Sequence, residues 1–149
     1  MEDREIVFEQ YKLYVELMDR VSERRHKTNN YFLSLNVFLI SFLGAISVSG
    51  FENLNFAWTF CASVAGMILC YSWYRLVKSY RDLNTGKFVL IHKIEECLPL
   101  QPFKDEWSEV GKGKDSKKYL PFTHIEVIVP TVFGVLYAIL MIWCLFKIF

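Results

Sequence analysis

The chain has 149 residues, enough for one domain, of which 53% are apolar and 17% aromatic, with a mean hydropathy of +0.22. This composition is typical of a membrane protein that keeps a water-facing part. The net charge of +1 carries no information about nucleic acid, and we expect no nucleic-acid partner. The four cysteines form no C-x-x-C pair, so neither a zinc site nor a disulfide framework is predicted.

The first segment, residues 3–27, has the periodicity of an amphipathic helix that we place in the cytosol. Its apolar residues recur at steps of four and three: Val7, Tyr11, Tyr14, Met18 and Val21. The partner of this face is the helix expected over 80–98, a neighbouring subunit or the lipid surface. Without Pro or Gly to interrupt it, the helix should continue into the first membrane span near Asn29.

Three uncharged runs predict three transmembrane helices, at 30–49, 56–75 and 124–147. The first two runs have 24 and 22 residues and the third has 20, at 127–146. Each is long enough to cross a hydrocarbon core of about 30 Å as a helix. The first two spans should form a hairpin, and Pro130 should bend or loosen the third. Because the first run begins behind a charged helix, we expect an uncleaved anchor.

Small side chains follow one face of each helix of the hairpin. Ser34, Ser41 and Gly44 lie on the first span, and Ala62 and Gly66 lie on the second. Close approach through small residues is the usual way for helices to associate in lipid, so these stripes predict packing within the hairpin or between subunits. Asn36 is the most polar residue at depth, where it either hydrogen-bonds across helices or lines a pore in an oligomer.

Residues 79–120 predict cytosolic helices followed by a basic loop. Gly86 is a candidate helix break, and a short helix should begin at Pro102. We expect the two parts to dock by stacking and charge pairing, through Tyr80, Arg81, Asn84 and Lys87 on one side and Glu106 and Trp107 on the other. The alternative is that Trp107 dips into the lipid headgroups. The loop lysines either contact anionic lipid or belong to a solvated linker: Lys112, Lys114, Lys117 and Lys118.

Charge asymmetry predicts the topology. Sixteen of the seventeen basic residues lie before Tyr31 or between 75 and 118, and basic residues gather on the cytoplasmic side of short loops. The N-terminus should therefore be inside and the C-terminus outside. The whole chain, 1–149, is interpreted as one all-α integral membrane domain.

No catalytic, cofactor-binding or metal-binding constellation can be assembled from the sequence, and we expect no enzyme. Glu23 and His26 have the Glu-x-x-His spacing of di-metal bundles, but His92-Lys93-Ile94-Glu95 is only a weak second candidate and the remaining helices offer no good one, so a solvated charged face explains them better. The uncharged cores of the spans carry no ionisable residue of the kind that marks ion pathways. Any conduction would require a ring of subunits.

Several motifs resemble a family of small bacterial membrane proteins, the RipA-like octameric membrane proteins. They are Trp73-Tyr74-Arg75, Ser79-Tyr80-Arg81-Asp82-Leu83-Asn84, Glu106-Trp107, Gly111-Lys112-Gly113-Lys114 and Tyr119-Leu120-Pro121-Phe122-Thr123-His124-Ile125-Glu126. The resemblance implies a homo-oligomeric ring of eight in the bacterial cytoplasmic (inner) membrane, and it implies no reaction.

Two functional hypotheses remain at this point. The first is a non-enzymatic scaffold or gated pore formed by the homo-oligomer. The alternative is a membrane-disrupting effector of a prokaryotic antiphage defence system, which a neighbouring cyclase or sensor gene would favour.

Overall fold

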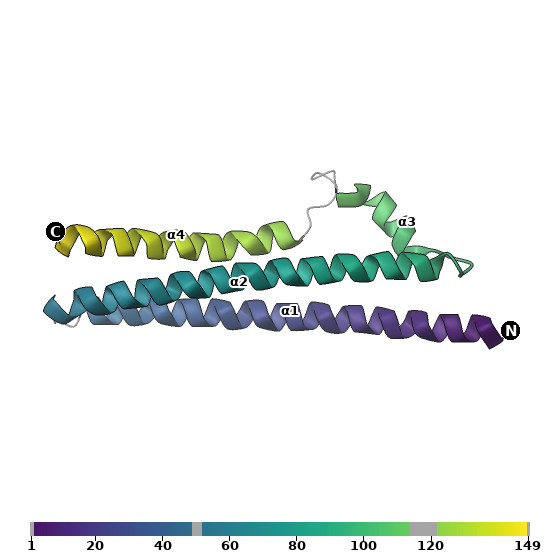
Figure 1. Cartoon of the computed structure of the whole chain (residues 1–149), viewed down its shortest axis with the longest axis horizontal. Helices are drawn as coiled ribbons and strands as arrows, with labels where there is room; N and C mark the ends of the chain where they lie inside the picture. The colour runs from purple at the N-terminus through teal and green to yellow at the C-terminus, as the bar shows by residue number, and fades with distance from the viewer. Residues whose placement is uncertain (1, 49–51, 114–121, 149) are drawn as a thin grey trace. The chain divides into compact units, whose positions relative to one another are not determined.

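The computed structural model describes residues 2–48, 52–113 and 122–148, and these residues are helical except for short connections (Figure 1). The helices are α1 (Glu2–Val48), α2 (Glu52–Glu95), α3 (Pro102–Glu109) and α4 (Phe122–Ile148), with a short 3-10 turn, η1 (Gly111–Gly113), after α3. Within the described residues there is no strand, which confirms the all-α prediction.

The two long helices have 47 and 44 residues and run without interruption. α1 passes Asn29 as one helix, as the sequence predicts. α2 continues through Gly86, so the candidate break there is not observed. The short helix predicted from Pro102 is α3, which carries that proline in its first turn.

Two helices are long and apolar enough to cross a membrane by length and composition. They are Phe56–Glu95 within α2 and Ile125–Lys147 within α4, with mean hydropathies of 1.4 and 2.3. The span predicted at 30–49 falls on the second half of α1, and its last residue lies outside the described part. The span at 30–49 and the N-in, C-out topology therefore remain predictions.

The chain divides into two compact units. One comprises Lys27–Val77 and Ile125–Phe149, and the other comprises Met1–His26 and Lys78–His124. We call the first the apolar unit and the second the charged unit, because 28 of the 33 charged residues of the sequence belong to the second.

The apolar unit packs parts of α1, α2 and α4 around two clusters. Phe32, Trp73 and Val77 form one cluster. Leu43, Cys70 and Tyr137 form the other. α4 runs continuously past Pro130, which is fully buried.

The charged unit combines the first half of α1, the last turns of α2, and α3. Its buried residues include Met18 on α1, and Ile91 and Glu95 on α2. α3 ends at a left-handed turn in which Gly111 and Lys112 have φ of 72° and 54°. The other lysines of the predicted basic loop, Lys114, Lys117 and Lys118, lie outside the described residues.

Candidate functional site

A fully buried asparagine joins the three helices of the apolar unit. The Asn36 Nδ2 donates to the Phe32 carbonyl at 2.8 Å, and its Oδ1 accepts from the Cys70 thiol at 3.4 Å. The Tyr137 hydroxyl donates to the Asn36 carbonyl at 3.3 Å. Since Asn36 lies on α1, Cys70 on α2 and Tyr137 on α4, this cluster satisfies its polar groups inside one subunit.

A second polar connection in the same unit is built on Asn29. The Trp73 indole N–H donates to Asn29 Oδ1 at 2.8 Å, and Asn29 Nδ2 donates to Glu126 Oε1 at 2.8 Å. The Trp73 ring also stacks on Phe32, with centroids 5.9 Å apart. Both ends of the Asn29 amide are thus used to connect α1 with α2 and with α4.

The small residues of the two spans occupy different environments. On α2, Gly66 is buried against the Tyr137 ring, and Ala62 packs against the cluster that contains Tyr137. On α1, Ser34, Ser41 and Gly44 are exposed, and a Cβ added at Gly44 would meet nothing within 4 Å. Only the α2 residues pack inside the subunit, so a role for the α1 residues in subunit contact remains a prediction.

The charged unit is organised by a buried carboxylate at the end of α2. Glu95 is fully buried, and its Oε1 accepts from the Tyr11 hydroxyl at 3.2 Å and from the Phe103 N–H at 2.9 Å. Its Oε2 accepts from the Lys104 N–H at 3.2 Å. Burial, together with the Glu95 carboxylate, raises the pKa of the Tyr11 hydroxyl.

Glu95 acts as the cap of α3. The N-cap residue Gln101 makes no side-chain hydrogen bond to the helix. A helix of eight residues is marginal by itself, and its first N–H groups need acceptors. The carboxylate supplies those acceptors and, through Tyr11, links α3 to α1.

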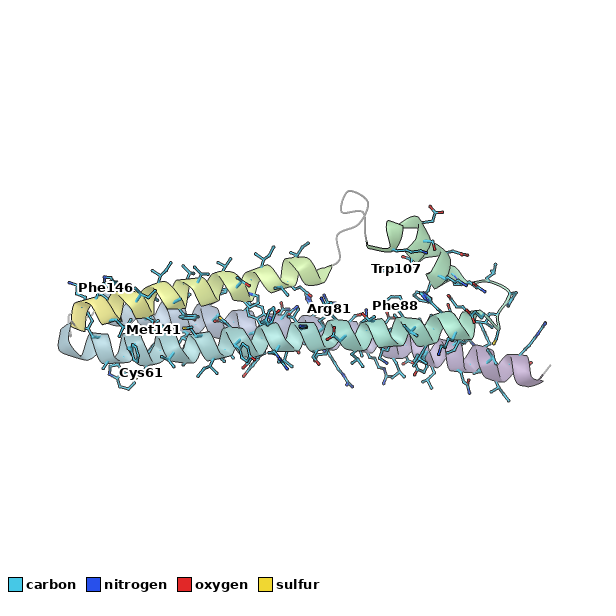
Figure 2. All side chains as sticks on the ribbon, turned by 45° about the horizontal axis from the view of Figure 1, so that its top comes forward. Cys61, Arg81, Phe88, Trp107, Met141 and Phe146 are labelled. Carbon is cyan, nitrogen blue, oxygen red and sulfur yellow. The ribbon has the colours of Figure 1, made fainter. Side chains whose placement is uncertain are left out.

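Aromatic rings cover the same side of the charged unit. Phe88 on α2 contacts Phe103 and stacks on Trp107 of α3, with centroids 6.1 and 6.4 Å apart (Figure 2). Tyr11 of α1 meets Phe103 edge to face at 6.3 Å. These contacts bring α1, α2 and α3 together next to the Glu95 hydrogen bonds.

Of the residues proposed to dock with Glu106 and Trp107, Tyr80, Asn84 and Lys87 share one face of α2. Lys87 lies over the Tyr14 ring of α1 at 5.4 Å, and Arg81 pairs with the adjacent Asp82 at 3.2 Å. Tyr80 and Asn84 are half-buried, and Glu106 is exposed. Trp107 stacks on Phe88, a residue that the sequence reasoning did not select, and the predicted docking of Trp107 with the other four residues stays a prediction.

The sequence reasoning also missed the roles of Glu95, Asn29 and Tyr137. The only signal for Tyr137 is that a hydroxyl-bearing ring interrupts an otherwise apolar run. Glu95 occurs beside Glu96 in a charged segment, and nothing in the sequence separates the buried member of this pair from the exposed one. Among the residues described, no group of three or more His, Cys, Asp or Glu side chains could hold a metal ion.

The model of the octameric membrane protein family (8xMP) matches residues 8–146, which include all four helices. The chain belongs to this family. The match confirms the resemblance to small octameric membrane proteins, whereas the narrower RipA-like relationship stays a prediction. No curated protein and no solved structure matches the chain. Membership and the two apolar helices identify it as a homo-oligomeric membrane protein.

Proposed function

We propose that the chain is a non-enzymatic scaffold subunit of an eight-membered ring in the bacterial cytoplasmic membrane. The proposal rests on one observation: two polar side chains of the apolar unit point toward helices of their own subunit. Asn29 and Asn36 bond to helices of their own subunit, and side chains such as Phe38, Ile68 and Ile139 remain exposed. Such a surface fits contact with lipid or with other copies.

The charged unit would then form a water-facing layer attached to each three-helix bundle. Its helices are fixed to one another by Glu95 and by the aromatic contacts of Phe88. A rigid layer of this kind suits holding subunits, or a further component, at a defined place on the membrane.

The test is to purify the full chain in mild detergent, measure its mass by native mass spectrometry, and reconstitute it into dye-loaded vesicles. A scaffold gives a discrete oligomer of eight copies and no release of dye or ions. A monomer would refute the proposal. Steady ion flux from the oligomer would favour a pore, and lysis of the vesicles would favour a membrane-disrupting effector.

A gated pore is the second candidate because Ser34 and Ser41 lie exposed, seven residues apart, on one face of α1. Hydroxyl groups repeated along a helix could line a water path in a ring. If they do, replacing both serines with leucine should abolish any ion flux while leaving the oligomer intact. Flux that is unaffected by both replacements would exclude this face as the lining.

The topology is tested by thiol labelling in intact cells. In a chain whose native cysteines are replaced, a cysteine at Asn53 should react with an impermeant reagent, and one at Ser116 should not. The motivation is the concentration of basic residues before Tyr31 and between 75 and 118. The reverse labelling pattern would overturn the N-in, C-out arrangement.

A further inference from the structure

The charged unit has an apolar stripe on α2 that is exposed among the residues the structure describes. Leu83 and Leu90 lie seven residues apart and are 50% and 43% exposed. The exposed residues of this face follow alternating steps of three and four, the spacing of a coiled-coil seam: Leu83, Gly86, Leu90 and Lys93. We call this set the α2 stripe. The buried residues of the same segment, Ile91 and Glu95, lie on another face.

A corresponding stripe occurs on the first half of α1. Leu13 is 56% exposed, and the exposed residues around it again alternate by four and three: Ile6, Gln10, Leu13 and Leu17. We call this set the α1 stripe. An adjacent face carries Tyr11, Tyr14 and Met18, which are buried or half-buried in the charged unit. Each helix therefore has one face for its own subunit and a second apolar face that the described residues of the charged unit leave exposed.

The two stripes lie on the same side of the α1–α2 pair. Tyr11 on α1 and Phe88 on α2 both contact Phe103 of α3. Leu13 and Leu90 each follow these residues by two positions, and two residues of an α-helix turn through about 200°. Both leucines therefore point away from α3, so the stripes together form one two-helix face.

The stripes are also matched in level along the helices. Tyr11 meets Glu95, and Tyr14 meets Lys87, so α1 and α2 run antiparallel through the charged unit (Figure 1). This register places members of the two stripes at common levels in the pairs Gln10 and Lys93, Leu13 and Leu90, and Leu17 and Gly86. The large side chain of Leu17 is thus level with Gly86, and Leu13 is level with Leu90.

Charge is complementary between the segments that carry the stripes. Within the charged unit, residues 2–26 of α1 contain seven acidic and five basic side chains, whereas residues 78–95 of α2 contain four basic and two acidic. The ion pairs Lys12–Glu9 and Arg20–Glu16 lie within α1 and leave the acidic excess in place. A surface with an acidic half and a basic half favours a partner in which the two halves are exchanged.

Gly86 gives an independent indication of close approach by another helix. It lies in the interior of α2, where glycine costs about 1 kcal/mol relative to alanine. A Cβ at this position would meet nothing within 4 Å, so packing inside the subunit gives no reason for the glycine. The backbone of a neighbouring helix, or a large side chain such as Leu17 of a second copy, would use the space.

We propose that this face binds the same face of a second copy, with the α1 stripe of each subunit against the α2 stripe of the other. A two-fold contact requires a self-complementary surface, in which residue i meets residue j and j meets i. Matched levels on one face, opposite charges and the Leu17–Gly86 pairing meet that requirement. The proposal rests on the homo-oligomeric scaffold, and eight copies would contain four such pairs.

The test uses two differently tagged full-length chains, co-expressed in membranes, in which the four native cysteines are replaced by alanine. One chain carries Leu13→Cys and the other carries Leu90→Cys. Oxidation should join them by a disulfide that contains both tags, which only a contact between subunits can produce. Neither chain expressed alone should form a covalent dimer. As a matched control, Leu13→Cys with Leu83→Cys should not react, because Leu83 is offset by two turns.

Three results would overturn the inference. They are the absence of a Leu13–Leu90 disulfide in an intact oligomer, a dimer formed by Leu13→Cys alone, and a ladder of covalent species larger than dimers from a chain with both cysteines. The first would leave the scaffold in place, because the mass of the cysteine-free oligomer is measured separately. A cysteine-free chain that is monomeric would refute both proposals.

A second variant tests the pairing without cysteine chemistry. Gly86→Leu fills the space level with Leu17, and its Cβ would meet no atom of the described residues within 4 Å. It should weaken the two-fold contact by about tenfold or more through overpacking, measured as dissociation on dilution in detergent. Thr85→Leu adds an exposed leucine beside the stripe and should leave dissociation unchanged. Equal behaviour of the two variants would place Gly86 outside the contact.

Discussion

The apolar unit and the charged unit each join three helices through buried polar side chains, but they use different chemistry. In the apolar unit the connecting groups are mostly neutral amides and hydroxyls, at Asn29, Asn36 and Tyr137. In the charged unit the connection is the Glu95 carboxylate, which accepts three hydrogen bonds from α1 and α3.

The difference follows from what each unit must hold in place. Long helices in lipid are stable individually, so a neutral hydrogen bond only selects how they pack. α3 has eight residues and no side-chain cap of its own, so it depends on an external acceptor. Removal of a polar group should therefore cost more in the charged unit than in the apolar unit.

The largest effect is expected for Glu95→Ala. It leaves the Tyr11 hydroxyl and the Phe103 and Lys104 N–H groups without their acceptor. The three hydrogen bonds are part-buried, so each donor left unsatisfied should cost about 1 kcal/mol, the lower end of the usual range, and the total should be about 3 kcal/mol. Hydrogen exchange of the α3 amides should accelerate correspondingly, while exchange in α4 stays unchanged.

Two matched variants test whether the faster exchange of α3 is specific to the loss of the Glu95 carboxylate. Glu96→Ala alters the exposed neighbour and should leave the exchange of α3 as in the original chain. Glu95→Gln keeps one acceptor oxygen and should give an intermediate result. Protection of α3 that is equal in Glu95→Ala and Glu96→Ala would show that Glu95 does not cap the helix.

The second prediction compares the two glycines of the small-residue stripes. A Cβ at Gly66 would lie 2.5 Å from the Tyr137 ring, whereas one at Gly44 would meet nothing within 4 Å. Gly66→Leu should therefore destabilise the subunit by about 1–3 kcal/mol through overpacking, measured by thermal unfolding in detergent. Gly44→Leu should leave that unfolding unchanged.

Gly44→Leu has a separate expected effect on assembly. Where the Ser34, Ser41 and Gly44 face contacts another subunit, the added leucine should dissociate or misassemble the oligomer, as judged by native mass spectrometry. An unchanged oligomer mass would show that Gly44 faces lipid. Unfolding that responds equally to both substitutions would contradict the packing difference between α1 and α2.

The two glycines also show which features of the structure can be predicted from the sequence and which cannot. Local signals predicted the helices, since long uncharged runs define α2 and α4, and Pro102 starts α3. The two small-residue stripes look alike in the sequence, and only the position of Tyr137 on α4 distinguishes Gly66 from Gly44. The Glu95 contacts depend on Tyr11, 84 residues away, and on backbone N–H groups that no sequence pattern marks.

The third prediction concerns Trp107, the aromatic anchor of α3. Its ring stacks on Phe88, but the residue is 37% exposed. Trp107→Ala should therefore cost about 1–2 kcal/mol, less than the 3–5 kcal/mol of a fully enclosed ring. Faster exchange of α3 and unchanged membrane insertion are expected. Quenching of Trp107 fluorescence by lipid-attached quenchers, with α3 unaffected, would place the ring in the headgroups.

The smallest effect is expected at Asn36, although its side chain is fully buried. Asn36→Val is an apolar replacement that is close in volume, and it removes the bonds to the Phe32 carbonyl and the Cys70 thiol. The Tyr137 bond uses the Asn36 backbone carbonyl and remains available. Side-chain hydrogen bonds between helices in a bilayer are worth about 0.6 kcal/mol on average, so the loss should be of that order. Reversible unfolding in mixed micelles measures it, with Ser22→Val, at an exposed position of the same helix, as the control. A loss of several kcal/mol would mean that the apolar unit depends on Asn36 as strongly as the charged unit depends on Glu95. The proposed difference between the two units would then be wrong.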